Sequence, residues 1–350
     1  MSKHIDSLIR PHIKKLIQSA KKEANFQQKI LLNKNENSIG SPLIKWYNRY
    51  PDNFQTTLKE ATSKIKNIAT ENIFFGNGTD ECINLLYTCF CEPQKDNIII
   101  CPPTNNRYEI AANIHNVAVR KANLLENFQL NMDMLETLVD EHTKIIWLCS
   151  PNNPTGNSLY REDIEIILNN FEGLVVIDEA YINFSRQKSF LQELKEYPNL
   201  IVLQTFSKAW GLAGLRLGVL FASIDIIHIL NCIKHPYNIN TATQELVLKA
   251  LENVSETNEM IKELVAMRKD LVKSLVQFLF IKKIYDSDTN FLLIKADVAD
   301  ELYQFLLNKN IVVENISNEP LCENCLRITI GTEKENAALI NAIADFSSKN

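Results

Sequence analysis

A lysine and an arginine follow one apolar stretch of this sequence. Residues 200–206 are mostly apolar, Ser207 and Lys208 come next, and Arg216 follows after several small residues. A lysine that is partly buried beside other cations has a lowered pKa, which suits it to proton transfer or to attack on a carbonyl carbon. The pattern therefore makes Lys208 the first candidate catalytic residue.

A carboxylate and a phenol follow a second apolar stretch. Asp178 comes directly after Val-Val-Ile, and Tyr181 comes three residues later. An ionised carboxylate at a buried strand end costs free energy unless a cation meets it, so Asp178 should have a cationic partner. Tyr181 is either a donor in the same site or a core tyrosine whose hydroxyl bonds to the backbone.

Two further strand ends offer an anion site and an amide. Residues 76–78, Gly-Asn-Gly, precede Thr79, Asp80 and Glu81, which would open a helix. Backbone N–H groups at a helix N-terminus favour an anion such as phosphate, although an ordinary capped turn has the same pattern. The fourth strand end continues as Ser-Pro-Asn-Asn-Pro-Thr-Gly and offers Asn153.

Alternating short strands and amphipathic helices must position these groups. This alternation, between residues 70 and 222, predicts an α/β domain with a mostly parallel sheet of the seven-stranded type, flanked by helices on both faces. Ligands of such sheets bind beyond the carboxyl ends of the strands, so the four strand ends should meet. The expected strands are 72–76, 97–101, 144–149, 174–181, 200–206 and 216–222, and the expected helices are 80–91, 104–115, 131–140 and 161–170.

The pattern changes after Pro236. Residues 241–280 contain no Pro or Gly and predict a long helical stretch. Strands near 290–294, 311–315 and 326–331 and helices near 298–309 and 333–347 should follow. We expect an N-terminal arm at 1–40, a large cofactor-binding domain at 41–236 and a smaller α+β C-terminal domain at 237–350. The arm has apolar residues at helical spacing and is expected to pack with the small domain.

Charge and composition argue against several classes of protein. The net charge of −5 disfavours nucleic-acid binding, and the longest apolar runs are too short to cross a bilayer. The N-terminal residues lack a continuous apolar segment, so we expect no signal peptide and a cytoplasmic location. The eight cysteines should be reduced, and the one CxxC pair, Cys322 and Cys325, has no second pair beside it. No metal site is therefore expected.

Together the four strand ends point to one cofactor. They supply a phosphate cradle, a carboxylate, a phenol, an amide, a lysine and an arginine. Pyridoxal 5'-phosphate has a phosphate, a basic ring nitrogen, a phenolic oxygen and an aldehyde, and would use every one of these groups. The sequence therefore predicts a pyridoxal-phosphate enzyme.

Several motifs resemble those of the fold-type I aminotransferases. They are SKAWGLAGLRLG at 207–218, DEAY at 178–181, SPNNPTG at 150–156 and GNGTDE at 76–81. A resemblance to the histidinol-phosphate aminotransferase branch rests on LNKNEN at 32–37, RYP at 49–51, CPPT at 101–104 and CLRITIGT at 325–332. The resemblance covers nearly the whole chain.

The resemblance implies a role for each catalytic residue. Lys208 would bond covalently to the aldehyde carbon of the cofactor and would later move a proton on the substrate. Asp178 would pair with the ring nitrogen. Tyr181 and Asn153 would donate hydrogen bonds to the phenolic oxygen.

The resemblance also implies how the phosphate and the substrate are held. The residues implied at the cofactor phosphate are Thr79, Asp80, Glu81, Ser207 and Arg216. Tyr50 would reach the cofactor phosphate of a neighbouring subunit, which implies a homodimer with shared sites. Asn35 and Arg327 would face the substrate, and Arg327 would bind its anionic group.

Four features depart from the branch pattern. Asn105 stands where an aromatic residue stacks on the cofactor ring, and Tyr108, three residues later, need not reach that ring. Glu314 stands in place of an arginine, and Lys34 in place of a small residue. Residues 16–23 lack the Pro-Tyr that helps to hold the substrate phosphate.

The implied reaction is transamination between L-histidinol phosphate and 2-oxoglutarate, a step of histidine biosynthesis. The departures leave open a transaminase of another amino acid, for example an aromatic one, and also a related decarboxylase or carbon–sulfur lyase. A cofactor-binding protein without catalysis is disfavoured, because titratable groups that converge at one sheet edge are typical of catalysis.

Overall fold

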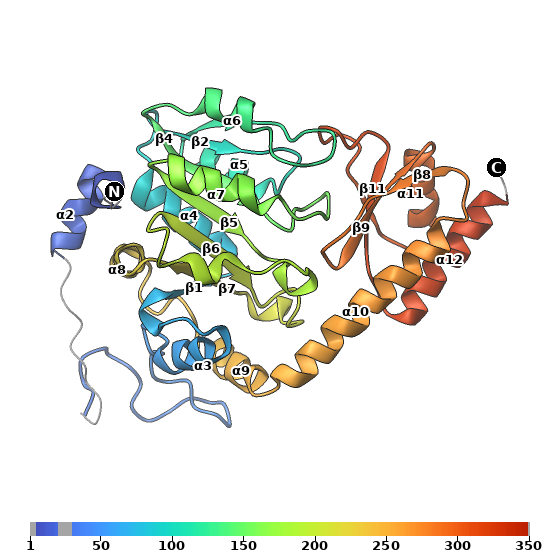
Figure 1. Ribbon diagram of the computed structural model, residues 1–350. Coiled ribbons are helices and arrows are strands. Elements are labelled where there is room, and N and C mark those ends of the chain that lie inside the picture. The colour runs from blue at the N-terminus through green and yellow to red at the C-terminus, as the bar shows by residue number, and fades with distance from the viewer. Residues whose placement is uncertain (1–4, 20–29, 349–350) are drawn as a thin grey trace.

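Two units, joined by the long helix α10 (Val254–Leu275), make up the chain in Figure 1. The computed structural model describes residues 5–19 and 30–348. The larger unit is a sheet with helices on both faces, and the smaller unit follows α10 in the chain. The active-site candidates lie in both units, so the contact between the units decides how the site is assembled.

The larger unit contains a seven-stranded sheet with strand order β1-β7-β6-β5-β4-β2-β3. Neighbouring strands are parallel from β6 to β3, whereas β7 runs antiparallel to β6 and to β1. The strands are β1 (Ile73–Asn77), β2 (Asn97–Ile100), β3 (Ala118–Lys121), β4 (Thr143–Cys149), β5 (Leu174–Asp178), β6 (Leu200–Thr205) and β7 (Leu217–Ala222). The predicted mostly parallel, seven-stranded sheet is confirmed.

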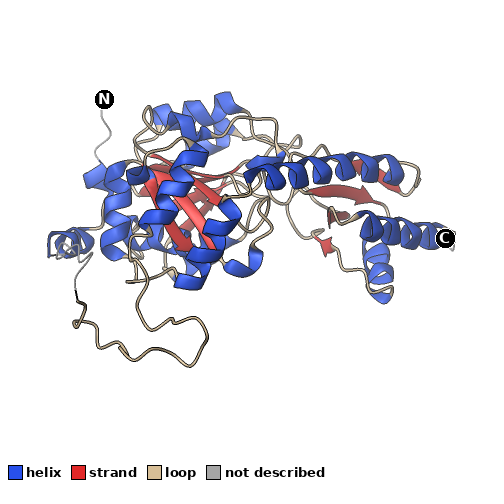
Figure 2. Cartoon of the chain, turned by 90° about the horizontal axis from the view of Figure 1, so that it is seen from below, coloured by secondary structure: helices blue, strands red, loops and turns tan. Residues whose placement is uncertain are grey.

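The central strands are apolar because both of their faces are covered (Figure 2). Successive side chains of a strand point to opposite faces. In β4, Ile146 and Leu148 enter one core cluster, and Ile145 and Trp147 enter another. Helices α3 (Thr56–Lys66), α6 (Met132–Leu138), α7 (Arg161–Asn170) and α9 (Thr241–Leu251) contribute to the first, and α4 (Thr79–Phe90), α5 (Arg107–Ile114) and α8 (Ile224–Ile233) to the second.

The smaller unit has a sheet and a core of its own, as predicted. Its antiparallel strand order is β10-β11-β9-β8. The strands are β8 (Ile281–Ile284), β9 (Phe291–Ala296), β10 (Glu314–Asn315) and β11 (Cys325–Thr329). Helices α11 (Ala299–Asn308) and α12 (Glu333–Ser347) pack with α10 and this sheet around a third apolar cluster. No helix of the described residues is long and apolar enough to span a bilayer.

The structure differs from the sequence predictions at several element boundaries. The predicted long helical stretch is two helices, α9 and α10, and the predicted strand 311–315 shrinks to β10. The domain boundary after residue 236 stays a prediction. Helix α9 packs on α3, which favours a place for α9 with the large sheet.

The N-terminal helices pack on the large unit, so the prediction that they pack with the small domain is wrong. Helices α1 (Ile5–Leu8) and α2 (Pro11–Ser19) and the turn between them bury Ile5, Ile13 and Ile9 in the same cluster as α4 and α8. The backbone N–H of Arg10 donates to the carbonyl oxygen of Cys89 at 3.0 Å. The apolar stripe was read correctly, but a stripe does not specify its partner surface.

Candidate active site

One pocket, of about 240 Å³, lies where the sequence predicted that the strand ends meet. Its walls come from the ends of β4, β5 and β6, from the start of α4 and from the loop before β7. The predicted site residues that line it are Thr79, Asp80, Asn153, Asp178, Tyr181, Ser207, Lys208 and Arg216. The parallel sheet thus brings together residues that are far apart in the sequence.

Asp178 is a buried carboxylate at the end of β5. Its Oδ2 accepts a hydrogen bond from the Tyr108 hydroxyl at 2.6 Å, and its Oδ1 accepts one from the Ala180 N–H at 3.0 Å. Burial raises the pKa of Asp178, while these two donors, the Asn105 amide and the Lys208 charge act against that rise. Such a carboxylate is suited to pair with a cationic ring nitrogen.

Tyr108 has a role that the sequence analysis did not assign. Its ring stacks on Trp147 with the ring centres 4.7 Å apart, and it is fully buried. Its hydroxyl therefore has a fixed direction, toward Asp178. The sequence analysis noted a tyrosine at this position, but no sequence signal indicated which way its side chain points.

Lys208 lies in the turn after β6. Its Nζ is 5.6 Å from the centre of the Tyr181 ring. The surrounding protein lowers the pKa of Lys208 by removing water from the amine, and the charges of Arg327 and Arg216 lower it further, whereas Asp178 opposes the shift. The lowered pKa increases the share of the neutral amine, which is the form that attacks carbonyl carbons.

The N-terminus of α4 and Arg216 together make a candidate anion site. Arg216 has a left-handed backbone, with φ +50°, and its Nη2 lies 3.5 Å from Oδ2 of Asp80. Oδ1 of Asp80 accepts a hydrogen bond from Arg107 at 2.8 Å, so a second arginine, which the sequence analysis missed, also lines the pocket. Backbone N–H groups at a helix start and two guanidinium groups favour a phosphate here.

Glycines make room for this anion site. A Cβ on Gly218 would lie 2.5 Å from the Thr79 nitrogen, and one on Gly78 would lie 2.7 Å from Nη2 of Arg216. A side chain at either position would push the helix start or the guanidinium away. The close approach of β7 to the start of α4 therefore depends on glycine.

The Glu81 side chain is not among those that line the Lys208 pocket. Its Oε2 accepts hydrogen bonds from the Asn77 N–H at 2.5 Å and from the Asn238 side-chain amide at 3.0 Å. The carboxylate thus stabilises the strand–helix turn, and any contact of Glu81 with a cofactor phosphate stays a prediction that would involve its backbone.

Arg327 connects the small unit to this pocket. It lies on β11, directly opposite Glu314 of β10. Its Nη1 donates to Oδ1 of Asn153, a pocket residue, and its Nη2 donates to Oε2 of Glu314 at 2.7 Å. The arginine predicted to bind the substrate is therefore beside the amide predicted to bind the cofactor.

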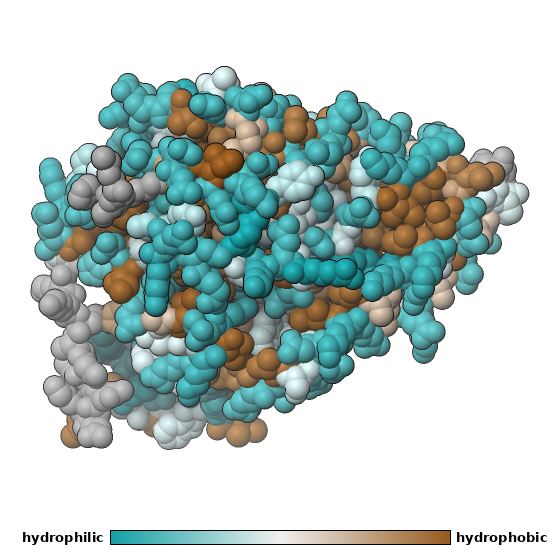
Figure 3. Space-filling view, viewed as in Figure 1, coloured by the Kyte–Doolittle hydropathy of each residue, from teal (hydrophilic) through white to brown (hydrophobic). Residues whose placement is uncertain are grey.

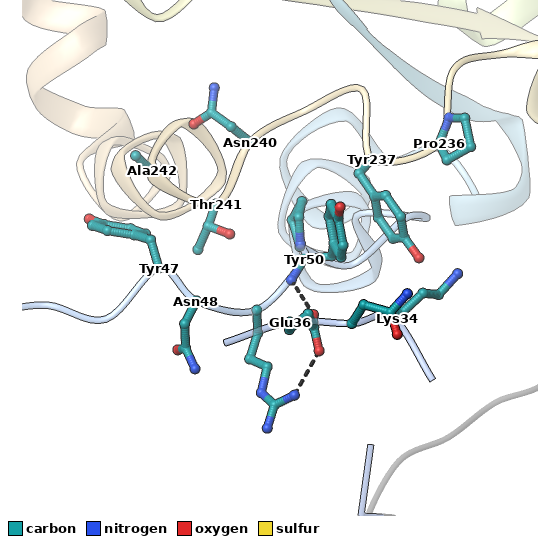
Figure 4. A pocket seen from close by; sticks show the side chains of 13 residues that line it. Lys34, Glu36, Tyr47, Asn48, Tyr50, Pro236, Tyr237, Asn240, Thr241 and Ala242 are labelled. Atoms are coloured by element: carbon teal, nitrogen blue, oxygen red, sulfur yellow. Dashed lines mark hydrogen bonds and ion pairs between the residues drawn. The ribbon is translucent and has the colours of Figure 1, made fainter. Parts of the chain in front are cut away.

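Asn35 and Tyr50 line a different pocket, of about 680 Å³, which has no lining residue in common with the Lys208 pocket among the described residues. Figure 4 shows Tyr50 beside Tyr237, and the two rings stack with their centres 4.7 Å apart. Glu36 accepts hydrogen bonds from the Tyr50 N–H and from Arg49, both at 2.7 Å (Figure 4). Lys34 lies 5.4 Å from the centre of the Tyr237 ring.

The Lys208 pocket fits pyridoxal phosphate. It has an anion site at a helix start, an amine with a lowered pKa, and a buried carboxylate with a raised pKa. Asn105 lines the pocket, where it offers no aromatic face, and its amide opposes the rise in the pKa of Asp178. Within residues 5–19 and 30–348, no cluster of His, Cys, Asp and Glu could hold a metal ion.

Comparison with known proteins gives a family match over most of the chain. The family model "Aminotransferase class I and II" matches residues 28–343. A histidinol-phosphate aminotransferase of Parabacteroides distasonis is 48% identical over 346 residues, which cover 98% of this chain and 99% of that relative.

Solved structures of similar fold agree with this match. The histidinol-phosphate aminotransferase of Clostridium acetobutylicum superposes with a TM-score of 0.80 at 24% identity, covering 87% of this chain and 92% of that one. A histidinol-phosphate aminotransferase of Sinorhizobium meliloti, solved with pyridoxal 5'-phosphate, has a TM-score of 0.78 at 19% identity, covering 86% and 83%. At these identities the likeness supports the fold alone.

Proposed function

This chain belongs to the class I and II aminotransferase family, and from that premise we propose that it transfers the amino group of L-histidinol phosphate to 2-oxoglutarate. The observation that carries the proposal is the pocket lined by Lys208, Asp178 and Arg216. Arg327 donates a hydrogen bond to Asn153, another residue that lines this pocket. The proposal includes a cytoplasmic location and a role in histidine biosynthesis.

The chain's own residues would divide the work of the reaction. Bound pyridoxal phosphate would supply an aldehyde for amines and a ring that takes up electrons. Lys208 would remove a proton from the substrate carbon that bears nitrogen and deliver it again. Asp178 would keep the ring nitrogen protonated. Arg216 and the start of α4 would hold the phosphate.

The substrates of the two half-reactions share one feature, an anionic group. L-Histidinol phosphate carries a phosphate, whereas glutamate and 2-oxoglutarate carry carboxylates. Arg327 lies beside Asn153 and has the planar guanidinium that binds such groups. We therefore assign the substrate anion in both half-reactions to Arg327. Asn35, which lines the other pocket, stays a predicted contact of the substrate.

A shared site in a homodimer is part of the proposal. Residues 30–54 contain no helix or strand and extend beyond the body of the molecule (Figures 1 and 2). They are rich in exposed large apolar side chains: Ile30, Leu31, Leu32, Ile39, Leu43, Ile44, Trp46, Tyr47, Tyr50 and Phe54. An apolar segment of this kind is typical of a surface that another chain covers. It also carries Tyr50, predicted to reach the neighbouring subunit.

The test of the activity is glutamate formation from L-histidinol phosphate and 2-oxoglutarate. The proposal predicts one glutamate for each histidinol phosphate consumed and no turnover without an oxo acid. Lys208→Ala should remove turnover. Release of carbon dioxide from an amino acid, or of sulfide from a sulfur-containing amino acid, in the absence of an oxo acid would instead identify a decarboxylase or a carbon–sulfur lyase. Transamination of aromatic amino acids alone would identify another transaminase.

The shared site is tested by subunit mixing. Lys208→Ala and Tyr50→Ala subunits, each with little activity alone, should regain activity on mixing. In the mixed dimer one site has both changes and the other has neither. If Tyr50 acted within its own subunit, mixing would restore nothing.

A further inference from the structure

We propose that Glu314 is a specificity-determining residue that holds Arg327 as an internal counter-ion, so that a substrate anion must compete with it. The competition should be stronger for a phosphate dianion than for a carboxylate. This inference rests on the proposed function for one point, the assignment of the substrate anion to Arg327.

The contacts of Arg327 within the chain are the starting point of the inference. Both of its terminal nitrogens are engaged by the chain itself, Nη1 by Asn153 and Nη2 by Glu314 at 2.7 Å. Arginine binds carboxylate and phosphate best through two parallel N–H groups. These two bonds use two of the five N–H groups of Arg327, so a ligand that approaches from the side of Glu314 competes with it for Nη2.

Glu314 is the acceptor that can leave. Its side chain is 61% exposed, whereas that of Arg327 is 23% exposed. Glu314 lies on a strand of only two residues, and it faces Arg327 in the register of β10 and β11. Exposed ion pairs contribute little stability, so the pair can open at small cost. Asn153, in contrast, lines the pocket itself.

An opened Glu314 still acts on the ligand through its charge. Repulsion between two groups is proportional to the product of their charges. A phosphate monoester near neutral pH, or inorganic phosphate at about pH 8, carries close to two negative charges, and a carboxylate carries one. The logarithm of the factor by which Glu314 weakens binding should thus be about twice as large for phosphate as for a carboxylate. If Glu314 weakens carboxylate binding about 3-fold, it should weaken phosphate binding about 10-fold.

The test compares Glu314→Gln with the wild-type holoenzyme. KM for L-glutamate and the inhibition constant of inorganic phosphate against L-glutamate are measured, and KM for L-histidinol phosphate is measured in the same way. We expect the variant to lower KM for glutamate about 3-fold and the phosphate constant about 10-fold, with kcat changed less than about 2-fold. Higher ionic strength should reduce these differences.

Glu323→Gln is the matched control. Glu323 is an exposed glutamate in the turn before β11, and the described residues show no ion pair between it and Arg327. Its removal changes the net charge by the same amount and should leave all three constants within about 2-fold.

The outcomes separate the inference from the proposed function. The role of Glu314 is overturned if Glu314→Gln and Glu323→Gln change the constants equally. It is also overturned if Glu314→Gln lowers neither KM for L-glutamate nor the inhibition constant of phosphate. If the wild type reacts with glutamate but not with L-histidinol phosphate, the proposed substrate is wrong. The glutamate and phosphate constants then still decide the role of Glu314.

Discussion

The ionisation of Asp178 depends on a few neighbouring atoms. Burial raises its pKa, and the Tyr108 hydroxyl is foremost among the groups that oppose the rise. The Tyr108 ring is held by its stack on Trp147. Tyr108 is thus a positioning residue, which acts on the cofactor through Asp178.

Removal of that hydroxyl tests this role. A hydrogen bond to a charged group contributes about 1.5–3 kcal/mol, so Tyr108→Phe should lower kcat about 10-fold at neutral pH. Because the donor stabilises the carboxylate, its loss raises the pKa of Asp178. The ionised form is then lost at a higher pH as the solution is acidified, and the acidic limb of the kcat profile should shift upward.

Tyr87→Phe is the control. The Tyr87 hydroxyl donates to the backbone oxygen of Tyr108 at 2.9 Å and does not contact Asp178. Its loss should lower thermal stability and leave the acidic limb in place. An unmoved acidic limb in Tyr108→Phe would show that the tyrosine has only a packing role.

Strand ends and a helix start decide where the chemistry occurs. The sequence predicted the fold class, six strands of the large sheet and most of the pocket, because buried strands are apolar and their ends carry polar groups. The sequence analysis did not predict strand β3, Ala-Val-Arg-Lys, because an exposed edge strand mixes polar with apolar residues. The sequence analysis also missed the separation of Asn35 from Lys208 and the Glu314–Arg327 pair. They depend on tertiary packing.

Gly218 tests the contact between β7 and the start of α4. Gly218→Ala would place a methyl group 2.5 Å from the Thr79 nitrogen. We expect a loss of about 1–3 kcal/mol in the free energy of unfolding from overpacking and at least about 10-fold weaker cofactor binding, because the anion site moves. Denaturant unfolding and a cofactor titration measure the two effects.

Gly214→Ala provides the comparison. Nothing lies within 4 Å of a Cβ at that position, so both quantities should stay near the wild-type values. Full cofactor affinity in Gly218→Ala would mean that the phosphate does not bind at this helix start.

The whole molecule has more than one exposed apolar surface. One is the segment 30–54, and Figure 3 shows another over the small unit, near β8 and α11. Leu279, in that unit, is 90% exposed. The segment is the better candidate for the subunit interface, because it also carries Asn35 and Tyr50, which lie apart from Lys208 in their own subunit.

Charge substitutions distinguish the two surfaces. Ile44→Glu places a carboxylate at a fully exposed apolar position of the segment and should shift the protein toward monomers, because a buried unpaired charge is costly. Leu279→Glu should leave the assembly unchanged. Sedimentation or light scattering gives the mass in solution, and dimers that persist in Ile44→Glu but dissociate in Leu279→Glu would reverse the assignment.

The most direct test of the account is one half-reaction. The holoenzyme with pyridoxal phosphate is mixed with L-histidinol phosphate without an oxo acid, and the absorbance of the cofactor is followed in the wild type and in Lys208→Ala. The account predicts that the wild type converts its cofactor to the amine form, that 2-oxoglutarate reverses the change, and that Lys208→Ala converts at least about 1,000-fold more slowly. Equal rates in both proteins, or conversion by L-glutamate but never by L-histidinol phosphate, would contradict it.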